Sequence, residues 1–113
     1  MSSGPARKVL IYRNCDVERV VAIIPEGHKH LRLIIEFRDQ TIVLQEATVA
    51  AIVRAYVSTV AHPTRRSIEL VMREFKPGEV KDGYALCQLI ETPTPEEELE
   101  RKWREVCSTS SQP

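Results

Sequence analysis

The sequence predicts an α+β fold: an antiparallel sheet of five to six strands, with one amphipathic helix packed across it and a short C-terminal helix. Short apolar runs with period-two alternation lie on both sides of one long run of period 3.6. Turn residues separate these runs, and 113 residues suffice for one domain with a modest core. We therefore expect a flexible N-terminus at 1–7, a single domain at 8–107 and a disordered tail at 108–113.

Four strands are predicted in the first half of the chain, at 8–13, 17–24, 31–37 and 41–44. Turn chemistry at 14–16, 25–27 and 38–40 separates them. In the predicted strand 31–37, alternation places four apolar residues on one face, while the other face is rich in basic side chains. The apolar set is Leu31, Leu33, Ile35 and Phe37.

The segment 45–61 changes to helical spacing. Its apolar residues are predicted to pack on the sheet, and its opposite side is small enough to allow close approach of a second element. The helix is expected to end at about Ala61, because a residue before proline disfavours the helical region. The apolar set is Val49, Ile52, Val53, Tyr56 and Val60, and the small set is Ala47, Ala51, Ala55 and Ser58.

Two further strands are predicted at 67–75 and 83–90, before a final helix. Thr94, Pro95 and Glu97 form the start signal of that helix, a capping box with proline at the first position. A narrow apolar stripe on it must dock on the body or on another subunit, because so short a helix is marginal alone. The stripe consists of Leu99, Trp103 and Val106.

The charges cancel overall, with 16 basic and 16 acidic residues, but they are unevenly distributed. Residues 1–73 hold 11 Lys and Arg against 7 Asp and Glu, whereas 91–113 hold 3 against 6. No apolar run reaches the roughly 20 residues that span a bilayer, so a soluble, cytoplasmic protein is expected. Three separated cysteines predict neither a disulfide scaffold nor a thiolate zinc site, and the few Asn and Gln residues favour a thermophilic source.

Basic residues gather in two short turns, 25–32 and 62–66, which also hold all three histidines. Loops on a rigid scaffold frequently bind ligands, and clustered cations suit a nucleic-acid backbone. We predict that the two turns converge on one basic, aromatic-flanked cleft that binds single-stranded DNA or RNA without catalysis and without a cofactor. The predicted contacts are His28, Lys29, His30, Arg32, Arg54, His62, Arg65 and Arg66, with Tyr12 and Phe37 as stacking groups and Phe75 and Tyr84 as further aromatic candidates.

Other interpretations remain open. A small metal-independent ribonuclease could use two histidines as acid and base, with Arg65 or Arg66 stabilising the transition state. His28 and His30 could also bind zinc with a third ligand. A protein-interaction subunit is a further alternative, and a homodimer is expected because the apolar stripes need a cover.

Three segments carry a family resemblance: 27–32 (GHKHLR), 45–56 (QEATVAAIVRAY) and 62–66 (HPTRR). On these the chain resembles the small archaeal relatives of the ThermoDBP single-stranded DNA-binding proteins, over about residues 8–91. The resemblance implies a compact sheet crossed by a helix, a basic and aromatic cleft, single-strand binding without chemistry, and self-association. The long zipper-like helical extension of the larger members is replaced here by 94–107 alone, which puts their dimer mode in doubt.

Overall fold

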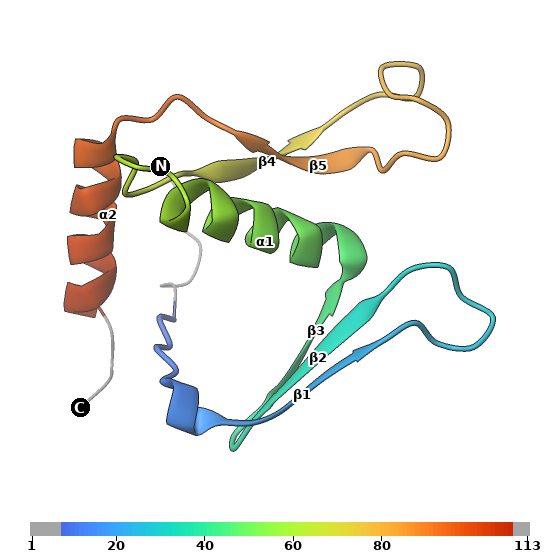
Figure 1. Ribbon diagram of the computed structural model, residues 1–113, viewed down its shortest axis with the longest axis horizontal. Helices are drawn as coiled ribbons and strands as arrows, with labels where there is room; N and C mark the ends of the chain where they lie inside the picture. The colour runs from blue at the N-terminus through green and yellow to red at the C-terminus, as the bar shows by residue number, and fades with distance from the viewer. Residues whose placement is uncertain (1–7, 110–113) are drawn as a thin grey trace.

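A computed structural model describes residues 8–109, which form two antiparallel sheets and two α-helices (Figure 1). The α+β class is confirmed, but the strands form sheets of three and two strands rather than one sheet of five to six. The predicted strand at 8–13 is not a strand, and the predicted flexible segment 1–7 lies outside the described residues. In chain order the elements are η1 (Asn14–Asp16), β1 (Val17–Ile23), β2 (Arg32–Phe37), β3 (Thr41–Gln45), α1 (Glu46–Val60), β4 (Leu70–Glu74), β5 (Cys87–Glu91) and α2 (Glu96–Thr109).

The first sheet has the order β1-β2-β3, with both pairs antiparallel. Its register places Ala22, Leu33 and Leu44 opposite one another, so these three residues share a face. The β2–β3 turn is tight, and the Phe37 amide donates to the Gln40 carbonyl at 2.8 Å. Each strand of this sheet therefore pairs with the next one along the chain.

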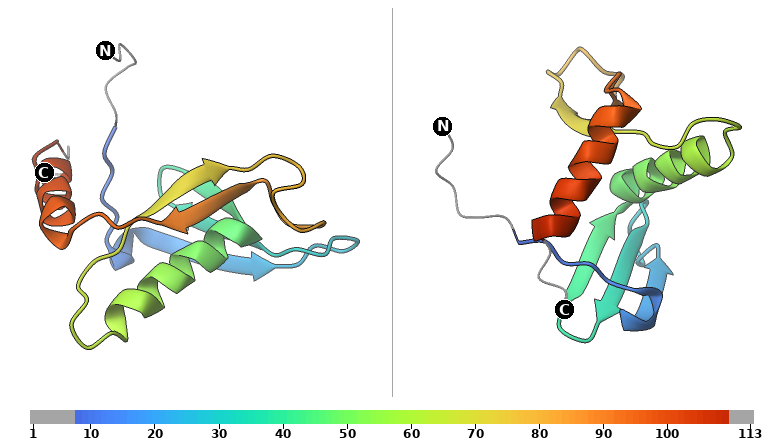
Figure 2. Two further views of the ribbon diagram at one scale, coloured as in Figure 1. Left: turned by 90° about the horizontal axis from the view of Figure 1, so that it is seen from above. Right: turned by 90° about the vertical axis from the view of Figure 1, so that its left-hand side faces the viewer.

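The helix α1 separates the two sheets, as Figures 1 and 2 show. It follows Gln45 without a loop, and its 15 residues carry the chain about 22 Å away from the first sheet. β4 therefore starts beyond the far end of α1, and the β4–β5 hairpin returns beside the helix instead of beside β1 or β3. This connection is why the strands do not join into a single sheet.

The rotation of α1 is the reverse of the predicted one. Its small face lies inward, where Ala51 is only 3% exposed. Of the large apolar residues expected to pack on the sheet, Val49 is half-buried, whereas Ile52, Val53, Tyr56 and Val60 lie outward and are more than half exposed. We call this outward set the α1 stripe: Ile52, Val53, Tyr56, Val57 and Val60.

The small face of α1 lies toward β5, and Ala47, Ala50 and Ala51 line a hollow of about 440 Å³ between the two elements. The Arg54 guanidinium donates to the Leu89 carbonyl of β5 at 3.0 Å. Leu89 lies opposite Met72 in the β4–β5 ladder, and this bond occupies a carbonyl on the outer edge of the hairpin. Arg54 therefore fastens the second sheet to α1.

The described chain buries very little apolar surface. Among residues 8–109 Ala51 alone is a buried hydrophobic residue, and 15 large hydrophobic side chains are exposed. The radius of gyration is 16.8 Å, against about 13 Å for a compact domain of this length. Alternation in β4 predicts that one face is buried, either that of Leu70 and Met72 or that of Val71 and Phe75, but Met72 and Val71 are both exposed.

Glu69 fixes the start of α2. The hydroxyls of Thr92 and Thr94 each donate to Glu69 Oε1 at 2.7 Å, and these bonds hold the pKa of Glu69 below its ordinary value. The helix extends to Thr109, two residues into the predicted tail, and 110–113 lie outside the described residues. Trp103 on α2 is 56% exposed, and neither described helix is long and apolar enough to span a bilayer.

Candidate nucleic-acid interface

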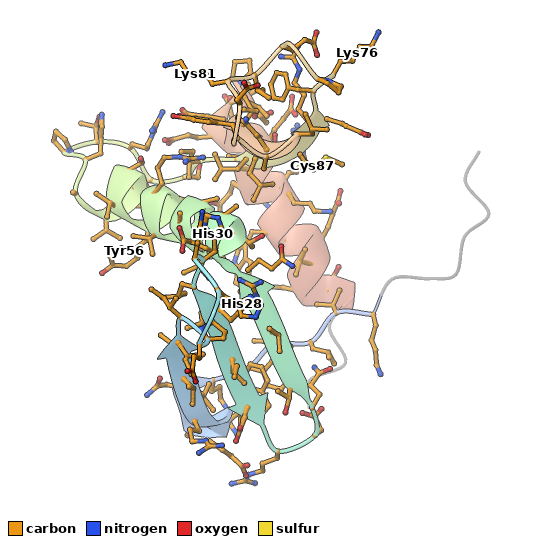
Figure 3. All side chains as sticks on the ribbon, turned by 90° about the vertical axis from the view of Figure 1, so that its right-hand side faces the viewer. His28, His30, Tyr56, Lys76, Lys81 and Cys87 are labelled. Atoms are coloured by element: carbon orange, nitrogen blue, oxygen red, sulfur yellow. The ribbon has the colours of Figure 1, made fainter. Side chains whose placement is uncertain are left out.

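The two cationic turns lie at opposite ends of α1. The first, 25–32, connects β1 to β2 and lies near the N-terminal end of the helix, where Figure 3 labels His28 and His30. The second, 62–66, follows the C-terminal end. About 22 Å of helix separates them. The prediction that the two turns converge is therefore wrong for one chain. They cannot meet, because α1 lies between them and holds them apart.

A tight turn supports the first cationic segment. The His28 amide donates to the Pro25 carbonyl at 2.9 Å, and Gly27 has φ of 82°. This combination suits a type II turn, in which glycine takes the left-handed position. Residues 28–30 follow with exposed side chains, so the turn presents His28, Lys29 and His30 to solvent.

Glu46, the first residue of α1, ties that turn to the helix. Its Oε1 accepts the Leu31 amide at 2.6 Å, and its Oε2 lies 3.7 Å from His30 Nδ1. The amide hydrogen bond, with the smaller effect of His30, holds the pKa of Glu46 below its ordinary value of 4.5. The carboxylate also faces the positive end of the helix dipole. Arg32 keeps its guanidinium on the backbone of the turn, at 3.2 Å from the His30 carbonyl.

A hollow of about 390 Å³ opens beside this turn, bounded by the first sheet, α1 and the loop before β5. Tyr84 comes from that loop and is 63% exposed, and Gly83 before it has φ of 88°. The hollow places an exposed aromatic ring beside a basic turn, the combination that single-strand binders use. We call it the Tyr84 hollow; its lining is His30, Arg32, Gln45, Glu46, Ala47, Ala50, Gly83, Tyr84 and Ala85.

The second turn is built from its own histidine. His62 Nδ1 accepts the amides of Thr64 and Arg65 at 3.1 and 2.8 Å, so the ring serves as an acceptor inside the turn. Arg65 pairs with Glu91 at 2.7 Å. The Arg66 amide donates to Glu96 at 3.0 Å, while its exposed guanidinium pairs with no carboxylate among residues 8–109. Of the predicted cations in this turn, Arg66 alone has a side chain available for a further anion.

Tyr12 and Phe37 stack on each other instead of flanking a basic cleft. Their centroids are 3.8 Å apart at an interplanar angle of 18°, and the Tyr12 hydroxyl donates to Asp39 at 3.0 Å. Phe37 ends β2, the strand that Arg32 begins, so the pair lies at the far end of the first sheet from the Tyr84 hollow. Burial and Asp39 raise the pKa of Tyr12. The signal that finds Tyr84 instead is its position beside glycine in a loop.

The histidines do not assemble into one group. His62 lies at the other end of α1 from His28 and His30, so the predicted acid–base pair with Arg65 or Arg66 could draw only on His62. In the part of the chain that the structure describes, no three His, Cys, Asp or Glu side chains lie where they could share a metal ion. The constellations behind the ribonuclease and zinc alternatives are therefore not formed here.

Glu46→Gln is expected to weaken the attachment of the first turn to α1 and to change the acid stability of the protein. A carboxylate with a lowered pKa stabilises the fold above its ordinary pKa, and this contribution is lost as the pH falls through the lower, folded value. The wild type should lose stability in urea as the pH falls below about 4.5. The variant should lose less over the same interval, while starting lower at pH 7. Equal pH dependence in the two proteins would contradict the role of Glu46.

No family model, curated protein or solved structure matches this chain. The resemblance to the ThermoDBP relatives therefore stays a prediction.

Proposed function

We propose that the protein binds single-stranded nucleic acid at the Tyr84 hollow, without cleaving it. The observation that carries the proposal is that His30 and Arg32, at the β1–β2 turn, and the exposed ring of Tyr84, in the β4–β5 loop, lie around one hollow. Arg32 and the neighbouring Lys29 suit the phosphates, and Tyr84 suits a base, whose stacking requires no particular sequence.

The net positive charge of the Tyr84 hollow within one chain is small. Lys29 and Arg32 are opposed by Glu46 and by Glu26 in the same turn, and the histidines add charge only when protonated. Affinity therefore depends on the ring as much as on the cations. Weak, salt-sensitive binding is the expectation for one protomer, and any further cation brought to the hollow would strengthen it.

A salt titration tests the proposal. Labelled single-stranded DNA and RNA should bind at low ionic strength, with log Kobs falling against log salt by about 1.4 if Lys29 and Arg32 neutralise two phosphates. Duplex DNA of the same sequence should compete poorly, because its bases cannot stack on Tyr84. RNA incubated with the protein in chelator should stay intact. Absence of single-strand affinity at low salt would overturn the proposal, and cleavage would favour the ribonuclease instead.

A protein-interaction subunit is the second candidate, favoured by the α1 stripe. Five large side chains on one helix face are each more than half exposed, which is unusual for a monomer. This candidate predicts no affinity for the oligonucleotides in the same titration. The stripe also bears on the first candidate, because a partner on it would lie next to the Tyr84 hollow.

A further inference from the structure

The described chain shows more surface than a self-sufficient domain of its mass. Its accessible area is 9587 Å², against about 6,300 Å² for a folded monomer of 12.9 kDa. The excess is about 3,300 Å². Obligate homodimers bury about 2,000–5,000 Å² in total. The chain thus exposes area on the scale that such a dimer removes from water.

The α1 stripe is the most continuous apolar part of that surface. Its members recur at helical spacing over the last three turns of α1, and none carries a charge. Within the described residues no element covers it, because all five side chains are more than half exposed in the presence of both sheets and α2. A second amphipathic helix is the surface that packs best against such a stripe.

We propose that two copies of the chain pair through their α1 stripes in antiparallel orientation, with the two-fold axis near Tyr56. Most homodimers are two-fold symmetric, and such an axis places the same patch on both sides. Ile52 and Val60 are each four residues from Tyr56, so Ile52 of one copy faces Val60 of the partner subunit. The chain has no net charge to oppose the approach of its own copy.

Antiparallel pairing brings the separated cationic turns together across the interface. Glu46, Ala50, Val53, Val57 and Val60 follow one another at spacings of four and three, so the stripe runs on into two residues that line the Tyr84 hollow. The partner's 62–66 turn directly follows the partner's Val60, which lies level with Ile52. That turn therefore extends toward the hollow.

The Tyr84 hollow also gains complementary charge when the 62–66 turn of the partner subunit lies beside it. α1 begins at Glu46 and ends at Val60, so antiparallel pairing turns the 62–66 segment of the partner subunit, with its Arg66, toward the end of the helix where Glu46 lies. The Arg66 guanidinium pairs with no carboxylate within residues 8–109, and Glu46 is the anion that opposes phosphate binding in the hollow. Its neutralisation by the partner's Arg66 would leave Lys29 available for phosphates, together with the guanidinium nitrogens of Arg32 that do not bond the turn backbone. This last step rests on the proposed function, whereas the dimer does not.

Disulfide cross-linking of the full-length chain tests the pairing. In a background with the exposed Cys15, Cys87 and Cys107 changed to serine, oxidised glutathione should link Tyr56→Cys to itself. Ile52→Cys and Val60→Cys should each stay unlinked alone, because two copies of either residue lie about 12 Å apart along the axis, beyond the roughly 7 Å reach of a disulfide. Mixed in equal amounts, they should link to each other. Self-linking of all three variants would indicate parallel helices and overturn the proposal.

Sedimentation of the wild type separates the two proposals. A dimer with the mixed Ile52→Cys and Val60→Cys link supports the inference even if no oligonucleotide binds, in which case the proposed function fails alone. A monomer that shows no link at any position overturns the dimer even if oligonucleotides bind. If both hold, Arg66→Ala should weaken single-strand binding several-fold, whereas Arg38→Ala, on the turn at the other end of the first sheet, should leave it unchanged.

Discussion

Val57→Asp is expected to convert the protein into a monomer and to lower its thermal midpoint. Val57 lies in the middle of the α1 stripe and is 51% exposed in one chain. In the dimer it contacts the facing helix, so the substitution places a carboxylate from each copy inside an apolar interface. Desolvating an unpaired charge costs several kcal/mol per ion, and the two like charges also repel each other.

The expected size of this effect is large. At about 3 kcal/mol per carboxylate, two substitutions weaken the dimer by about 6 kcal/mol, or roughly 10⁴-fold. The wild-type midpoint should rise with protein concentration, as it does whenever association stabilises the folded state. The variant should lose this dependence, and its midpoint should be lower at every concentration, measured by circular dichroism beside sedimentation.

Val43→Asp provides the matched control. Val43 lies on β3 of the first sheet and is 58% exposed, so it undergoes the same change at similar exposure away from α1. It should retain the dimer mass and the concentration dependence. Loss of the dimer in this variant but not in Val57→Asp would place the interface on the sheet and contradict the α1 pairing.

How well each element could be predicted depended on whether its determinants lie close together in the sequence. The strands β1, β2 and β3 and the limits of α1 depend on alternation, turn residues and the proline at 63, all of which are legible in the sequence. The rotation of α1 is not local. The apolar stripe was assigned to the sheet because a buried face is normally the more apolar one, whereas here the Ala51 side approaches β5 and the stripe is left exposed.

The candidate site was predicted in composition and missed in arrangement. Arg65 and Arg54 were expected to be free cations, but Glu91 and the Leu89 carbonyl engage them. The order of a sequence does not show which carboxylate lies opposite an arginine, since Arg65 and Glu91 are 26 positions apart. Similarly, the sequence does not show that the ring of Tyr12 is occupied by Phe37, which lies 25 positions away, whereas the glycine beside Tyr84 is a local sign of an exposed loop.

Tyr84→Ala is expected to weaken single-strand binding without changing its salt dependence. Loss of one stacked base costs about 1–3 kcal/mol, which corresponds to roughly 5- to 150-fold in affinity. Tyr84→Phe keeps the ring face and should bind nearly as well as the wild type. The thermal midpoint should stay nearly constant in both variants, because the side chain is 63% exposed in a loop.

Arg32→Ala should also weaken single-strand binding, but by removing a charge. Comparison with Tyr84→Ala therefore distinguishes a phosphate contact from base stacking. Removal of one phosphate contact lowers the salt slope by about 0.7, whereas Tyr84→Ala removes no charge and leaves the slope unchanged. Fluorescence anisotropy at several salt concentrations measures both quantities. If Tyr84→Ala binds like the wild type while Arg32→Ala is weakened, the cations act without the ring and the hollow is not a base-stacking site. If neither substitution matters, the hollow is not the binding site, because Tyr84 supplies its one phenol ring and Arg32 its one guanidinium.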